Sequence, residues 1–162
     1  MQKRTLSVSV ENNPGVLTRV TTLLWRRGYN INSLTVGPTE IEGVSRMTIV
    51  VEGDEKIVEQ VIKQLYKLIE VIKIIDISRE YAVERELVMI KVKADSASRG
   101  EIVQMVNIFR ARVVDVSTNT LVVEVTGDQG KINALEQSLT PYGIIEIVRT
   151  GKVAMVRGNG GK

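Results

Sequence analysis

The sequence predicts an α+β protein in which a β-α-β-β-α-β unit occurs twice in tandem. Segments with alternating apolar residues and segments with apolar residues every three or four positions follow one another in the same order in both halves. Gly53-Asp54 and Gly127-Asp128 each introduce the second helical segment of their half, at an offset of 74 residues. A charged stretch at residues 79–86 separates the halves, which predicts two domains, 1–79 and 80–162.

The first half begins with a half-buried strand, because apolar and polar residues alternate from Thr5 to Val10. A helix follows, with Asn13 as its predicted N-cap, Pro14 in its first turn and Gly28 as its left-handed end. The other elements predicted for this half are strands at 30–36 and 45–52, a helix opened by Gly53-Asp54, and a strand at 71–77.

The second half repeats this order, starting with an alternating strand that ends at Lys93. Ser98 and Glu101 have the spacing of a capping box before the next helix, and the last helix stops at Pro141. Two units of this kind are ferredoxin-like: each makes a four-stranded antiparallel sheet with both helices on one face. The other elements predicted for this half are strands at 112–116, 121–125 and 144–148, a helix opened by Gly127-Asp128, and a flexible glycine-rich end at 157–162.

The sheet face away from the helices carries apolar residues in both halves. They are Val50, Val71, Ile75, Leu87 and Met89. An apolar surface of this kind favours contact with a partner, although loops of the domain itself can also cover it. We therefore expect at least a homodimer, formed through the first half.

The composition excludes several classes of function. The chain has no cysteine and no histidine, which excludes disulfides, zinc fingers and nucleophilic triads that depend on histidine. Basic and acidic residues number 11 and 10 in residues 1–80, and 11 and 9 in residues 81–162, so no nucleic-acid partner is indicated. No acidic cluster has the spacing of a metal site. The sequence has no membrane-length apolar run and no signal peptide, so a cytoplasmic protein is expected.

The turn between the first strand and the first helix is the main candidate for ligand binding. Amides at a helix start lack internal partners and lie at the positive end of the helix dipole, so they can bind a carboxylate. Gly15 allows a ligand to approach the backbone, and Asn12 offers both a donor and an acceptor. The alternative is that this turn only starts a helix, and that Asn30 and Asn32 are only solvated residues at a strand end.

Several longer motifs of the chain resemble a known family. The stretches 11–17 and 26–31 resemble the signature of ACT domains, which are amino-acid-binding regulatory modules. The run from Arg27 to Thr39, followed by 45–49, is similar to the small, regulatory subunit of acetohydroxyacid synthase (acetolactate synthase). The similarity continues through 53–56, 63–65, 85–87, 108–111, 113–116, 130–132, 149–151 and 157–158, and so covers essentially the whole chain.

The resemblance implies a non-catalytic subunit whose first domain is an ACT domain. In that family the catalytic subunit carries thiamine diphosphate, FAD and magnesium and acts in valine, leucine and isoleucine biosynthesis, and the small subunit binds none of these cofactors. The small subunit activates its partner and confers feedback inhibition by a branched-chain amino acid, usually valine.

The family also implies where the effector binds. It lies between two ACT domains, so one protomer supplies its first turn and the other supplies the start of its second strand. Loop amides would bind the valine carboxylate, an Asn carbonyl its ammonium group, and Ile31 its isopropyl group. Two alternatives remain open: a free-standing amino-acid-sensing ACT regulator, and a small ferredoxin-like enzyme with a shifted carboxylate. Carried onto this chain, the effector residues are Asn12, Pro14, Gly15, Val16, Leu17, Asn30 and Ile31.

Overall fold

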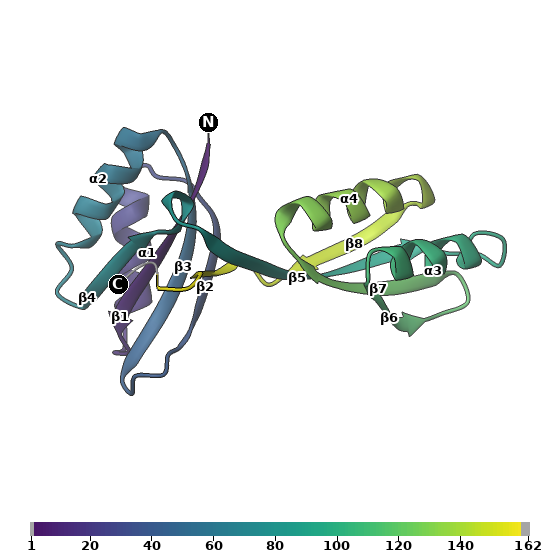
Figure 1. Cartoon of the computed structure of the whole chain (residues 1–162), viewed down its shortest axis with the longest axis horizontal. Helices are drawn as coiled ribbons and strands as arrows, with labels where there is room; N and C mark the ends of the chain where they lie inside the picture. The colour runs from purple at the N-terminus through teal and green to yellow at the C-terminus, as the bar shows by residue number, and fades with distance from the viewer. Residues whose placement is uncertain (1, 160–162) are drawn as a thin grey trace. The chain divides into compact units, whose positions relative to one another are not determined.

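The structure, a computed structural model, describes residues 2–159 and divides them into two compact units (Figure 1). The first unit runs up to Val83 and also includes the described residues from Lys152 onward; the second unit is Glu84–Gly151. Each unit contains an antiparallel sheet and two α-helices in the predicted β-α-β-β-α-β order. The predicted α+β class, with two ferredoxin-like units, is confirmed.

The first unit is a four-stranded sheet with two helices on one face. Its core joins inward-facing residues of the central strands, such as Leu6 and Ile49, to Val20 and Leu24 of the first helix, all of them fully buried. Its strand order is β2-β3-β1-β4. Its elements are β1 (Lys3–Glu11), α1 (Val16–Arg26), β2 (Ile31–Pro38), β3 (Val44–Glu52), α2 (Glu55–Leu65), β4 (Val71–Asp76) and the 3-10 turn η1 (Ile77–Arg79).

The second unit repeats the arrangement, with strand order β6-β7-β5-β8. Val88, Ile90 and Val92 of its first strand are fully buried, as the alternation predicts. Its elements are β5 (Ala82–Lys93), α3 (Arg99–Ile108), β6 (Arg112–Val116), β7 (Thr120–Gly127), α4 (Gln129–Leu139), the 3-10 turn η2 (Thr140–Tyr142) and β8 (Ile144–Arg149). No helix in the described part of the chain is long and apolar enough to cross a membrane.

The end of the chain corrects the predicted domain boundary. After β8 the chain forms a further short strand, β9 (Val153–Val156), which pairs with β5 and belongs to the first unit. The Arg157 amide donates to the Tyr81 carbonyl at 2.8 Å, and the Arg157 guanidinium lies 5.1 Å from the centre of the Tyr81 ring. The charged stretch 79–86 is therefore no open linker. The first compact unit extends beyond the predicted division at residue 79, to Val83, and also takes in the described residues from Lys152 onward. Of the tail expected to be flexible, residues 160–162 lie outside the described part.

The outer face of the first sheet is covered by the chain itself. Thr5, Thr48 and Val50 lie opposite the core-facing positions, yet each is no more than 4% exposed. The Thr5 amide donates to Ser78 Oγ at 2.7 Å, and Thr35 Oγ1, on the same face, donates to the Lys152 carbonyl at 3.1 Å. The turn η1 and the returning C-terminal segment thus occupy a face that was predicted to be free for a partner.

Two local predictions are also corrected. Val71 packs on the core instead of the outer face, because the β1–β4 register shifts between Ser9 and Val10. Ser98 and Glu101 form no capping box. Instead the Asp95 carboxylate accepts from the Ser98 amide at 2.8 Å and from the Ser98 hydroxyl at 2.9 Å, and these bonds lower the Asp95 pKa. The Glu101 carboxylate accepts from the Tyr142 hydroxyl, which raises the tyrosine pKa.

Candidate functional site

The turn between β1 and α1 adopts a conformation that favours glycine. Gly15 is the N-cap of α1 and has φ 84°, in the left-handed region. The helix begins at Val16, so Asn13 is not its cap and Pro14 lies before it, which corrects the predicted helix start. We call residues 12–15 the β1–α1 loop. A Cβ atom built on Gly15 would have no neighbour within 4 Å, so the space above it is open.

The start of α1 leaves backbone donors without acceptors. No side chain caps the helix, and the Arg19 amide, which donates to the Gly15 carbonyl at 3.0 Å, is the first with a helical partner. Within the described residues, the amides of Leu17 and Thr18 have no acceptor. Pro14 has no amide hydrogen to offer. The positive end of the α1 dipole is therefore open to an anion.

The other three α-helices of the described chain begin differently. Each has a carboxylate that accepts from amides of its first turn or of the turn before it: Asp54 in α2, Asp95 in α3 and Asp128 in α4. Asp54 and Asp128, which the sequence predicted to open their helices, are thus the N-caps of α2 and α4. The first turn of α1 contains no acidic residue. A carboxylate from outside the chain could accept hydrogen bonds from the free amides of α1, as these aspartates do at the other helix starts.

Contacts with two other segments hold the β1–α1 loop in position. The Asn12 amide donates to the Gly43 carbonyl at 2.8 Å, and the Glu11 amide donates to the Glu70 carbonyl at 2.9 Å. The buried Glu70 carboxylate also forms an ion pair with Arg19 of α1 at 2.5 Å. The loop is therefore fixed by the β2–β3 hairpin and by the start of β4.

The predicted loop residues differ in what they can offer a ligand. The Val16 side chain is 3% exposed and belongs to the core, so it cannot contact a ligand directly. Leu17 is 43% exposed and provides apolar surface beside the open amides. Asn12, Pro14 and Gly15 are all exposed. Among the predicted residues, a ligand thus finds the carboxamide of Asn12, the apolar side chain of Leu17 and the backbone donors of the first helical turn.

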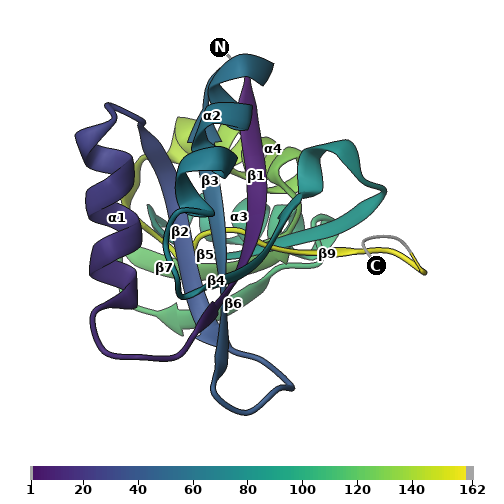
Figure 2. The same ribbon diagram turned by 90° about the vertical axis from the view of Figure 1, so that its left-hand side faces the viewer.

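Asn30 and Ile31 lie at the other end of α1. The helix has 11 residues and so is about 16 Å long at 1.5 Å per residue. Figure 2 shows α1 with the chain entering one end from β1 and leaving the other towards β2. Asn30 is exposed, and Ile31 is half-buried against the core. One chain therefore does not bring the two groups of predicted residues together.

The strand register gives the same result. Glu11, just before the β1–α1 loop, pairs with Val44 at the start of β3. The next residue of β3, Ser45, pairs with Pro38 at the end of β2. Ile31, at the start of β2, pairs with Val51 at the opposite end of β3. Since β2 is an edge strand, its outer side is available to another strand.

The chain resembles known proteins over its whole length. Residues 6–73 match the family model of the AHAS small subunit-like ACT domain, and residues 85–158 match that of the small subunit of acetolactate synthase. The chain belongs to the acetolactate synthase small-subunit family. The first match confirms the ACT assignment of the first unit.

Individual members of this small-subunit family are also similar. A probable acetolactate synthase small subunit of Archaeoglobus fulgidus is 62% identical over 97% of this chain and 98% of its own length. An acetolactate synthase small subunit of Mycobacterium bovis is 54% identical over 95% of this chain and 92% of its own length. The crystal structure of the small subunit from Thermotoga maritima matches with a TM-score of 0.87 at 43% identity, covering 98% and 99% of the two chains.

For this small subunit, sequence reasoning missed some residues of the candidate site. The open amide of Thr18 follows from a helix that starts at Val16, and taking Gly15 rather than Asn13 as the N-cap would have found it. The supports Gly43 and Glu70 are distant in sequence and leave no local signal. The structure describes no group of three or more acidic residues, placed to hold a metal ion, in residues 2–159.

Proposed function

We propose that this small subunit activates the catalytic subunit of acetolactate synthase and makes it sensitive to feedback inhibition by valine. The observation that carries the effector part is the uncapped start of α1 beside an exposed Leu17. In this proposal the chain is non-catalytic and acts in the cytoplasm. Thiamine diphosphate, FAD and magnesium are held by the catalytic subunit.

The chemistry of the effector matches the groups available. The valine carboxylate accepts from the Leu17 and Thr18 amides at the positive end of α1. The ammonium group donates to the side-chain carbonyl of Asn30, and the isopropyl group contacts Leu17 and Ile31. Hydrogen bonds to charged groups are worth about 1.5–3 kcal/mol each, enough to select an amino acid over an apolar molecule of similar size.

A homodimer supplies the two halves of this site. If the β2 edge strands of two copies pair antiparallel, the start of one β2 meets the end of the other. The register puts the end of β2 level with the β1–α1 loop. Asn30 and Ile31 of one protomer then lie level with the loop of its partner. A two-fold axis makes two such sites, as expected for the commonest closed oligomer.

Complementation between two inactive variants tests the two-chain site. Gly15→Asp damages the loop half and Asn30→Ala damages the strand half, and each homodimer is expected to bind valine weakly. A purified heterodimer of the two variants has one doubly damaged site and one intact site, so calorimetry should recover wild-type affinity at half of the sites. A site built within one chain would stay damaged in every protomer, and the heterodimer would show no wild-type binding.

The regulatory role is tested with the full chain and a catalytic subunit. We expect acetolactate formation to rise when the small subunit is added, and valine to reverse this rise. The isolated chain should bind valine in calorimetry, with leucine and isoleucine as the comparison ligands. Valine binding without any effect on, or complex with, the catalytic subunit would instead indicate a free-standing amino-acid sensor.

A further inference from the structure

A groove of about 460 Å³ lies between α1 and the end of α2, on the helical side of the first unit. Its lining follows α1 from Thr18 to Arg27 and includes no residue of the β1–α1 loop; only Thr18, at one end of the groove, also belongs to the candidate effector site. The aliphatic residues that line it are Leu23 and Leu68, which pack on the core, and the basic residues that line it are Arg19, Arg26, Arg27 and Lys67.

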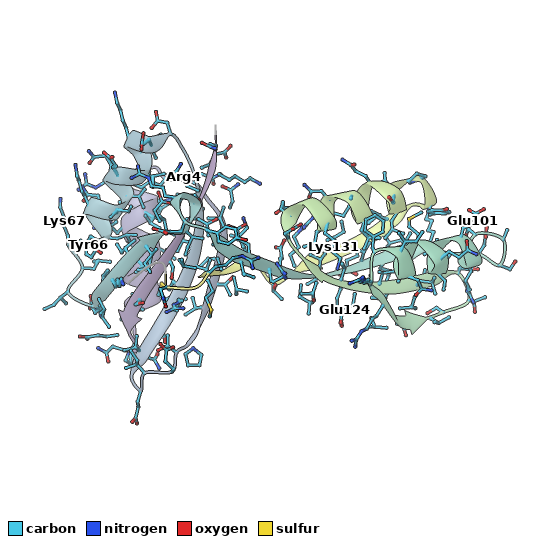
Figure 3. The ribbon with its side chains drawn as sticks, in the orientation of Figure 1. Arg4, Tyr66, Lys67, Glu101, Glu124 and Lys131 are labelled. Carbon is cyan, nitrogen blue, oxygen red and sulfur yellow. The ribbon has the colours of Figure 1, made fainter. Side chains whose placement is uncertain are left out.

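The positive charge of this α1–α2 groove is largely uncompensated. Arg19 pairs with Glu70, but Arg26, Arg27 and Lys67 have no ion pair within the described residues. None of the residues described as lining the groove is acidic, and α1 itself contains no acidic residue. Lys67 lies at the outer edge of the unit, near the end of α2, in Figure 3. An occupant that carries carboxylates would supply the missing charge.

Exposed apolar residues beside the groove favour a protein as that occupant. Trp25, the one tryptophan of the sequence, is 76% exposed and lies one helical turn from Thr22 of the lining. Ile69, directly after Leu68, is 91% exposed. Tryptophan and arginine are the residue types that dominate binding hot spots between proteins. A small anion would use the charges of the groove but would leave this apolar surface in water.

We propose that the α1–α2 groove is the docking site for an acidic segment of the acetolactate synthase catalytic subunit that also carries an apolar anchor. The inference rests on the proposed function, since it gives the activating contact a location. Carboxylates of the segment pair with Arg26, Arg27 and Lys67, and its anchor packs on Trp25 and Leu23. Because α1 also carries the open amides of the effector site, effector and partner act on the same helix.

Charge reversal with a matched control tests the docking site. Arg26→Glu/Lys67→Glu changes one residue on each wall of the groove. Lys56→Glu/Lys63→Glu makes the same change in net charge at exposed positions of α2 outside the groove. We expect the groove variant to bind the catalytic subunit at least ten-fold more weakly, mainly through a slower association rate, and the control to change by less than three-fold. Trp25→Ala should weaken binding by about ten-fold and leave its salt dependence unchanged.

The readouts separate this inference from the proposed function. Both double variants should bind valine with wild-type affinity in calorimetry, which also shows that they are folded. If the wild-type chain binds and activates the catalytic subunit but the groove variant loses no more than the control, the docking site is wrong and the regulatory function stands. If the wild-type chain does not bind the catalytic subunit, both fail. The third outcome concerns inorganic phosphate. If phosphate changes the Trp25 fluorescence of the wild type but not of the groove variant, and the groove variant still binds the catalytic subunit, the groove is a small-anion site and the inference is overturned.

Discussion

Replacing Gly15 with Asp adds a carboxylate at the N-cap of α1, where the carboxylate of the effector is proposed to bind. The space above Gly15 is open, so the new side chain meets no neighbouring atom. Its own carboxylate can accept from the free amides of the first turn, as Asp54 does in α2. The substitution therefore occupies the anion site with a charge that belongs to the chain.

The expected loss of valine affinity is large. Two like charges ~4 Å apart repel by about 1 kcal/mol in water and about 4 kcal/mol near a protein surface. Losing hydrogen bonds from the amides to a charged group costs about another 1.5–3 kcal/mol. Since each 1.4 kcal/mol is a factor of ten, binding should weaken roughly 100-fold or more.

The backbone conformation of Gly15 calls for a matched control. With φ 84°, any side chain at this position strains the backbone by ~1–2 kcal/mol, although Asp and Asn tolerate this region better than other residues. Gly15→Asn has the same strain without the charge. Calorimetry should show a far greater loss of valine binding for Asp than for Asn, with activation of the catalytic subunit kept in both. A folded Gly15→Asp protein that is still inhibited at the wild-type valine concentration would refute the loop as the carboxylate site.

Three further predictions concern stability and assembly. A fragment that ends at Arg79 keeps all of β1–β4 but loses the C-terminal segment that covers Thr35. We expect it to fold with a melting temperature roughly 5–10 °C below that of the first unit in the full chain. An unchanged melting temperature would mean that β9 contributes nothing to the stability of this unit. Asp95→Asn should destabilise the protein at pH 7. The lowered pKa of Asp95 contributes stability above the unfolded-state pKa of about 3.9, and this stability is lost as the pH falls through the folded-state pKa. In acid unfolding curves, the difference between the variant and the wild type should therefore disappear at low pH. Sedimentation should show a dimer at micromolar concentration that valine stabilises, and a monomer in saturating valine would contradict the two-chain site.

Periodicity predicted most of the fold because burial imposes it directly. Leu6, Val8 and Val10 alternate because one face of β1 meets the helices, and the same is true of Val88, Ile90 and Val92 in β5. Asp54 and Asp128 marked helix starts correctly because their carboxylates bond amides three residues further on. Where one local interaction decides the structure, the local sequence contains the necessary information.

The errors occur where distant segments decide the structure. The four residues of β9 are too few to show a period, and their place depends on Tyr81 and Thr35, more than 70 and 110 positions away. The outer face of the first sheet was taken as free because nothing in its own strands shows that η1 and residue 152 cover it. Asparagine is a common N-cap residue, but the N-cap of α1 is Gly15, in the left-handed conformation, two residues after Asn13.

The length of α1 links the candidate site to the assembly of the protein. The helix separates the β1–α1 loop from Asn30 by about 16 Å, a distance greater than the size of an amino acid. A ligand that contacts both must therefore be held by two chains, and its binding free energy then adds to the stability of the dimer. At its other end the same helix carries Arg26, which lines the proposed docking groove, and the exposed Trp25 next to it. In the proposed homodimer, a small shift of α1 in response to the effector would thus move both the docking groove and the effector site that Asn30 completes in the partner protomer. The proposed feedback inhibition would then be transmitted through α1 alone.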